Sequence, residues 1–144
     1  MSEQMTRSEI KQYIALARED LEAARDNLHF GHLRAAVSRA YYARFYATTA
    51  LLGGRGLWRS KHQGLIAAFE EQFVEPGLIE PQYGRILHDA FDARLDSDYG
   101  PNPDLDESSA QQLLSNAESF VARLAQILES SQQDEVDYDV DEPV

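Results

Sequence analysis

Apolar residues recur every three or four positions along most of this chain, which is the spacing of one face of an α-helix. Near the start, the recurring positions are Ile10, Ile14, Ala17, Leu21, Ala24 and Leu28. Thr6 and Glu9 have the spacing of a capping box, so we expect a helix to begin there. Gly31 is expected to end it. No strand-like alternation competes with this pattern.

The same periodicity, together with turn-forming residues, predicts four more helices. We expect them at about 32–52, 60–74 and 82–98, and from 104 or 106 onward. Glycine and proline separate these segments, and they are the strongest local signals for turns. The apolar stripe of the last helix consists of Leu113, Ala117, Phe120, Leu124 and Ile127. We therefore predict an all-α fold, an up-and-down helical bundle of four long helices plus a shorter one.

The chain changes character at its C-terminal end. Residues 132–144 include six acidic residues, no basic residue and few apolar ones. Such a segment cannot bury enough apolar surface to offset the entropy lost on ordering. We therefore divide the chain into one helical domain, residues 1–131, and an acidic disordered tail, residues 132–144.

Charge is distributed unevenly along the chain. The sequence has 25 acidic and 13 basic residues, for a net charge of −12, which argues against general coating of DNA and against binding anionic membranes by charge. Residues 27–69 nevertheless contain no acidic residue and six Lys or Arg. A local field of one sign attracts the opposite charge whatever the net charge. We expect this basic segment to serve an anionic partner or a buried polar site.

Several kinds of site are excluded by residues that the sequence lacks. There is no cysteine, so we expect no disulfide, zinc–thiolate site or thiol chemistry. The histidines lack metal-ligand spacing, and Pro101 stands where a calcium loop needs glycine, so we expect no metal and no cofactor. No apolar run approaches the length of a membrane span and no signal peptide is present, so we expect a cytoplasmic protein with no membrane partner.

The expected second helix is apolar or aromatic on almost every side. One face consists of Ser38, Arg39, Tyr42 and Tyr46, and another of the small residues Ala36, Ala43 and Ala47, which allow a neighbouring helix to approach closely. Such a helix is central to a bundle or packs against a second subunit. Two interpretations of its polar face stay open. The tyrosines are core or interface residues, or they line a cleft with Arg39 that holds a phosphate and a base or ribose.

Three blocks of sequence carry a family resemblance. They are Ser38-Arg39-Ala40-Tyr41-Tyr42-Ala43-x-Phe45-x-Ala47-x-x-Ala50-Leu51-Leu52, then Lys61-His62-x-Gly64 with Phe69, and then Arg94-x4-Tyr99. Together they resemble the HEPN (higher eukaryotes and prokaryotes nucleotide-binding) family over residues 8–128. The resemblance implies an all-helical bundle that forms a homodimer. It also implies a frequent role as partner of a minimal nucleotidyltransferase in a toxin–antitoxin pair, and many relatives are metal-independent endoribonucleases.

The chain departs from the ribonuclease members of that family at one motif. Those members carry Arg-x4–6-His, whereas no histidine follows Arg94 at that spacing and Tyr99 lies five residues on. An unperturbed tyrosine, with a pKa of about 10, is poorly suited to proton transfer at neutral pH. The resemblance therefore implies Arg94 and Tyr99 as the catalytic pair of a weakened or altered activity, or as part of a site that only binds.

Arg94 and His62 each have two interpretations. Arg94 falls on the apolar side of its helix, where a buried arginine needs anionic or multiple acceptors. It either pairs with a carboxylate of the first or last helix, or binds a phosphate in a cleft at a dimer seam. His62 either caps or lies at the surface near its helix start, or faces a phosphate near Arg39.

The expected function is binding of RNA or a nucleotide by a homodimer. Arg39, Tyr42, Tyr46 and His62 are the expected binding residues, with Arg94 and Tyr99 as the catalytic pair. A separate nucleotidyltransferase chain is the expected protein partner. The alternative is a non-catalytic homodimeric interaction or regulatory module, whose aromatic helix serves only in assembly.

Overall fold

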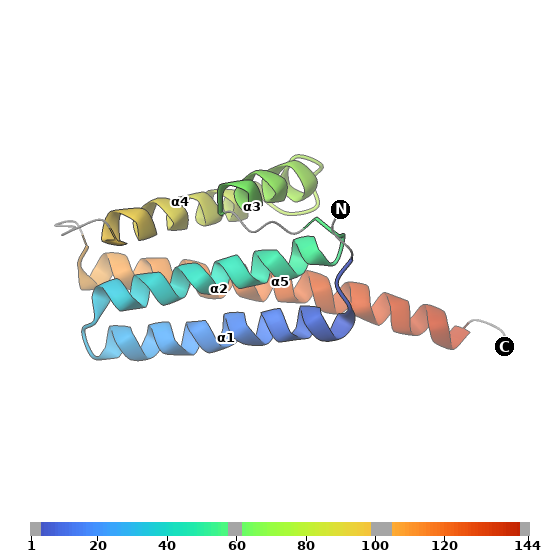
Figure 1. Ribbon diagram of the computed structural model, residues 1–144, viewed down its shortest axis with the longest axis horizontal. Coiled ribbons are helices and arrows are strands. Elements are labelled where there is room, and N and C mark those ends of the chain that lie inside the picture. The colour runs from blue at the N-terminus through green and yellow to red at the C-terminus, as the bar shows by residue number, and fades with distance from the viewer. Residues whose placement is uncertain (1–3, 58–61, 99–104, 142–144) are drawn as a thin grey trace.

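The computed structural model describes residues 4–57, 62–98 and 105–141, and the side chains of 4–57, 64–89 and 105–130 among them. Its elements in chain order are α1 (Arg7–His29), α2 (Leu33–Gly53), α3 (His62–Phe69), the π-helix η1 (Glu70–Val74), α4 (Pro81–Asp98) and α5 (Glu107–Asp141). No strand occurs within these ranges. The prediction of an all-α fold with four long helices and a shorter one is confirmed (Figure 1).

Local sequence signals determine where α1 and α4 begin. The Glu9 backbone N–H donates to Thr6 Oγ1 and the Thr6 backbone N–H donates to Glu9 Oε1, both at 3.1 Å, so the capping box is complete. α1 is followed by Gly31, whose φ of +80° lies in the left-handed region that favours glycine. α4 starts at Pro81, a first helical position where the missing N–H of proline costs little.

The segment predicted as one helix at 60–74 contains two kinds of helix. α3 ends at Phe69, and the chain then continues as the π-helix η1. The predicted capping residue, Ser60, lies outside the described residues. Glu70 of η1 lies against α4 at Gly84, where an added Cβ would be 2.2 Å from Glu70 Oε1. A glycine on α4 therefore leaves room for the Glu70 side chain.

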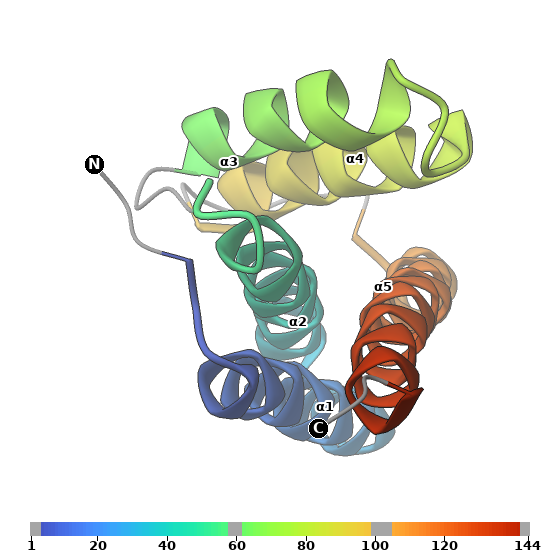
Figure 2. The same ribbon diagram turned by 90° about the vertical axis from the view of Figure 1, so that its right-hand side faces the viewer.

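α2 is the central helix of the bundle. It packs against α1, α3, α4 and α5, and Figure 2 shows it between α1 on one side and α3 with α4 on the other. Its small-residue stripe is buried, with Ala36, Ala43 and Ala47 at most 2% exposed. The predicted close approach of a neighbouring helix therefore occurs inside the chain, and the stripe is not accessible to a second subunit.

Aromatic rings connect α3 and η1 to α5. The ring centroid of Phe69 lies 5.7 Å from that of Phe120 and 6.2 Å from that of Phe73. All three side chains are buried. Because α3 and α4 also pack on α2, this contact closes the core around the central helix.

α5 continues further than the sequence predicts. The segment 132–144 was expected to be a disordered tail, whereas the backbone is helical to Asp141. No glycine or proline occurs between Glu107 and Asp141, so nothing in the sequence interrupts a helix once the packed part has nucleated it. In Figure 1 the end of α5 runs past the ends of the other helices. The division of the chain at residue 131 stays a prediction.

Two kinds of feature are absent from the parts of the chain that the structure describes. No helix there combines the length and apolar character needed to cross a bilayer. No group of three or more His, Asp or Glu side chains there could hold a metal ion.

Candidate functional site: the α1–α2 face

An ion pair joins α1 to α2 on the outer side of the bundle. Arg39 Nη1 donates to Asp20 Oδ1 at 3.0 Å. The Asp20 side chain is only 13% exposed, and that of Arg39 is 41% exposed. Burial raises the pKa of the Asp20 carboxyl above its usual value, although the Arg39 guanidinium acts in the opposite direction. The Asp20 carboxylate is therefore partly desolvated, and the attraction of Arg39 only partly offsets the free-energy cost of burying it.

Aromatic side chains surround this ion pair. The Arg39 guanidinium carbon lies 5.0 Å from the centre of the Tyr42 ring, within the range of a cation–π contact. Tyr42 lies 6.3 Å from Tyr46, and Tyr46 lies 6.1 Å from Tyr13 of α1, measured between ring centroids. Phe45 lies 5.9 Å from Tyr46. These aromatic side chains are half-buried, so the rings form a surface that keeps contact with solvent.

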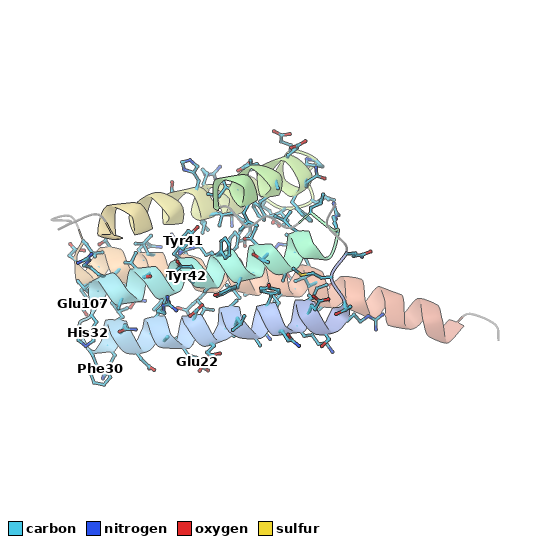
Figure 3. All side chains as sticks on the ribbon, viewed as in Figure 1. Glu22, Phe30, His32, Tyr41, Tyr42 and Glu107 are labelled. Atoms are coloured by element: carbon cyan, nitrogen blue, oxygen red, sulfur yellow. The ribbon has the colours of Figure 1, made fainter. Side chains whose placement is uncertain are left out.

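We call this surface the α1–α2 face. It consists of Tyr13, Leu16 and Asp20 of α1 with Arg39, Tyr42, Phe45 and Tyr46 of α2. Leu16 shares the helix side of Tyr13 and Asp20, and it is 40% exposed, which few of the described large apolar side chains are. Figure 3 labels Tyr42 together with its neighbour Tyr41, which is buried among the helices. Three predicted binding residues thus lie together, as helical periodicity predicts: Arg39, Tyr42 and Tyr46.

The predicted cleft around Arg39 stays a prediction. Arg39 is held by Asp20 and Tyr42. Two hollows of the described surface lie elsewhere: a groove of about 540 Å³ between α1 and α5, and a pocket of about 310 Å³ beside the N-terminal segment. Neither is lined by Arg39, Tyr42 or Tyr46. An intramolecular carboxylate thus takes one N–H donor of Arg39.

The remaining predicted site residues stay predictions. Arg94 belongs to the last part of α4, but its side chain is outside the described residues, and Tyr99 lies outside them altogether. His62 is the first residue of α3, and its side chain is likewise not described. The structure therefore brings together the α2 members of the predicted site and leaves its other half undescribed.

Arg44 is a buried charged residue that the sequence analysis counted only among the basic residues. It is 1% exposed, its Nη2 donates to the backbone carbonyl of Leu113 on α5, and its Nε is buried without a hydrogen-bond partner. Burial lowers the pKa of its guanidinium to about 9. The helical spacing of the sequence already indicated that Arg44 is buried. Arg44 lies four residues from Ala40 and from Thr48, which are both core positions of α2.

Comparison with known proteins identifies a family and several relatives of this chain. Residues 10–128 match the HEPN domain. A UPF0332 protein of Thermotoga maritima is 36% identical over 113 residues, which cover 78% of this chain and 86% of that protein. A Methanocaldococcus jannaschii protein named "Putative toxin MJ0605" is 38% identical over 122 residues, 85% of this chain and 90% of its own. A second protein of that organism, "Putative toxin MJ0142", is 26% identical over 120 residues, 83% and 82% of the two chains.

Proposed function

Because the chain belongs to the HEPN domain family, we propose that it is the toxin-type member of a toxin–antitoxin pair, a helical homodimer that binds RNA or a nucleotide. The observation that carries this proposal is its similarity, over most of both chains, to two proteins whose names contain the words "Putative toxin". The acid-free segment 27–69 supports an anionic ligand through its basic residues other than Arg44, which is buried. A small nucleotidyltransferase is the proposed protein partner.

Chemistry at the proposed RNA site would centre on Arg94 and Tyr99. Arg94 would hold a phosphate by charge-assisted hydrogen bonds and stabilise the charge that develops there during strand cleavage. Tyr99 would position that phosphate or donate a proton. Without a histidine at this spacing, proton transfer near neutral pH is slower, so the proposed metal-independent endoribonuclease activity is weakened or altered.

Arg39, Tyr42, Tyr46 and His62 are proposed to bind the RNA or nucleotide. Arg39 uses one of its five N–H donors in the hydrogen bond to Asp20, so other donors remain for a phosphate oxygen. The rings of Tyr42 and Tyr46 are half-exposed and their planes are inclined by 35° to each other, and exposed aromatic rings of this kind stack with RNA bases. The ligand would therefore bind along the outer side of α2.

The same face is the proposed contact between two subunits. It holds half-exposed aromatic rings, which are enriched at protein interfaces, beside an exposed leucine, Leu16. The alternative small-residue stripe of α2 is buried within the chain. A homodimer formed through the α1–α2 face would place one Arg39 from each subunit near the seam.

The ion pair of Arg39 with Asp20 favours a second candidate function. If the intramolecular bond saturates Arg39, the aromatic face serves assembly alone. The protein would then be a non-catalytic homodimeric interaction or regulatory module. The two candidates differ in whether the dimer has any affinity for RNA.

An RNA-binding and cleavage assay in the presence of EDTA distinguishes the two. The proposed function predicts that the wild-type protein binds RNA and cleaves it without a divalent metal. Arg94→Ala should then lose about 1.5–3 kcal/mol of binding free energy, the range for a charged hydrogen bond. Arg85→Ala removes an exposed arginine of the same helix and should bind as the wild type does. A folded wild-type dimer with no affinity for RNA would favour the second function.

A further inference from the structure

A pocket lies at the end of the bundle where the N-terminal segment crosses the turn after α2. Its volume is about 310 Å³, at the lower end of the range for small-molecule sites. Its walls come from the N-terminal segment and α1, the end of α2, η1 and α5. The lining includes Arg7, Ile10, Leu51, Arg55, Phe73 and Leu128. No residue of the α1–α2 face belongs to it.

The N-terminal wall of this pocket is held in place by a close backbone contact. The Met5 backbone N–H donates to the Gly53 carbonyl at 2.8 Å. The Met5 sulfur lies directly over Gly53, where an added Cβ would be only 2.2 Å from it. The capping box of Thr6 then fixes the start of α1. The segment before α1 is therefore packed against the end of α2 and forms one side of the pocket.

The opposite wall combines an aromatic ring with an arginine. Phe73 comes from the π-helix η1, an element that is frequent at functional sites. The guanidinium carbon of Arg55 lies 4.4 Å from the centre of the Phe73 ring. A guanidinium stacked in this way keeps the N–H groups at its edge available for an anion. Among the described residues, no carboxylate lies within ion-pair distance of Arg55.

The charged residues around the pocket indicate which charge its ligand carries. Among the described residues, two arginines, Arg7 and Arg55, line it and no acidic residue does, although the chain has 25 acids and only 13 bases. Glu9, the nearest acid along α1, is engaged in the capping box. The groove between α1 and α5 is different, because three glutamates share its lining with Lys11 and Arg18. Of these two hollows, the pocket beside the N-terminal segment is thus the one whose described lining holds arginines and no carboxylate.

Apolar side chains form the floor beneath these arginines. Ile10, Leu51 and Leu128 are each at most 8% exposed, yet all three line the pocket. Removing an apolar group of a ligand from water against such a floor is favourable at roughly 25 cal/mol per Å². A ligand that matches the whole pocket therefore needs an apolar body as well as a negative group.

We propose that this pocket binds a small organic anion, with its carboxylate or phosphate at Arg55 and Arg7 and its apolar body on Ile10, Leu51 and Leu128. This site is separate from the proposed RNA-binding surface. It would make the end of the bundle responsive to a small metabolite-like ligand of that chemistry. The proposal holds whether or not the protein cleaves RNA.

Titration of the full-length protein with phenyl phosphate, followed by the backbone amide signals in NMR, tests the site. A ligand of this size should bind with Kd on the order of 1 mM. We expect saturable shifts at Met5, Gly54 and Arg55. Benzyl alcohol lacks the charge and inorganic phosphate lacks the apolar body, so both should bind much more weakly. Benzoate in place of phenyl phosphate shows which acidic group the arginines prefer.

Arg55→Gln provides the decisive comparison, with Arg34→Gln as its control. Arg34 is exposed at the other end of α2 and its substitution changes the net charge equally. Arg55→Gln should weaken phenyl phosphate about tenfold, as expected for loss of a charged hydrogen bond, and Arg34→Gln should leave it unchanged. The amide spectrum itself reports whether each variant is folded, and Arg7→Gln supplies a second variant. No saturable shift, or equal affinity in Arg55→Gln, Arg7→Gln and wild type, would overturn the proposal.

Discussion

Asp20 and Arg39 form an ion pair across the contact of α1 with α2 that only partly offsets the burial of its carboxylate. Arg39 Nη1 lies 3.0 Å from Asp20 Oδ1, yet burial still raises the pKa of the Asp20 carboxyl. A pair of this kind positions a cation on the surface more than it stabilises the fold. It therefore matters both for stability and for the availability of Arg39 to a ligand.

Asp20→Asn should gain stability relative to the wild type as the pH rises from about 4 to 7. A carboxyl whose pKa is raised by folding binds its proton more tightly in the native state. Ionisation above the unfolded value of 3.8 therefore lowers the free energy of unfolding of the wild type. Asparagine keeps an oxygen that accepts from Arg39 and has no proton to lose. Urea unfolding of both proteins at the two pH values measures this, and an equal difference at both would contradict it.

Arg44→Met should raise the free energy of unfolding at neutral pH by about 1–4 kcal/mol, as when buried charges are replaced by apolar side chains of similar size. The difference in free energy of unfolding between Arg44→Met and the wild type should become smaller above pH 9. Folding lowers the pKa of Arg44 to about 9, so the native protein loses this proton before the unfolded one and gains stability as the pH rises. Denaturant unfolding at neutral and alkaline pH tests both parts. A destabilised variant would show that the bond to the Leu113 carbonyl outweighs the cost of burying the charge.

Ala47→Leu should destabilise the protein by about 1–3 kcal/mol, because an enlarged side chain cannot fit where α2 meets its neighbours. Ala47 is fully buried. Ala35→Leu makes the same change at an exposed position of α2 and should have little effect. Thermal unfolding of the two variants compares them directly. Equal melting temperatures would mean that the small-residue stripe is not needed for close packing.

Leu16→Glu should convert the proposed dimer to a monomer without unfolding it. Leu16 is 40% exposed within the chain, so a charge there is solvated in a monomer and would be desolvated in a dimer seam. Ser119→Glu adds the same charge at an exposed position of α5. Size-exclusion chromatography with light scattering should show a dimer for the wild type and for Ser119→Glu. A clean wild-type monomer at micromolar concentration would end the dimer proposal.

Deleting residues 132–144 should leave the melting temperature unchanged. This segment is poor in apolar side chains, and in Figure 1 the end of α5 extends past the other helices. Deletion also removes six of the 25 acidic residues, so binding of anions to the basic segment should strengthen, and more at low salt. A large fall in melting temperature would show that the segment contributes to the packed domain.

Much of the fold follows from residues that are neighbours in the sequence. The Thr6–Glu9 capping box and the turn at Gly31 act over a few residues, and each appears where the sequence predicts it. Of the predicted α5 stripe, Ala117, Phe120 and Leu124 are buried, whereas Leu113 and Ile127 are half-buried. Helical periodicity likewise places Arg39, Tyr42 and Tyr46 on one face of α2, because residues three and four apart share a side of any helix. The family was also recognisable from motifs of this kind.

Tertiary structure decided which distant residues these faces meet. The partner of Arg39 is Asp20, 19 residues away, and the acceptor of Arg44 is the Leu113 carbonyl, 69 residues away. The pocket beside the N-terminal segment joins Arg7 to Arg55 and Phe73. No local signal predicts such pairs, since they depend on how far each helix is rotated and shifted against its neighbours. The packing of the whole core sets that rotation, so the sequence determined the helices and their faces, and only the assembled bundle determined their contacts.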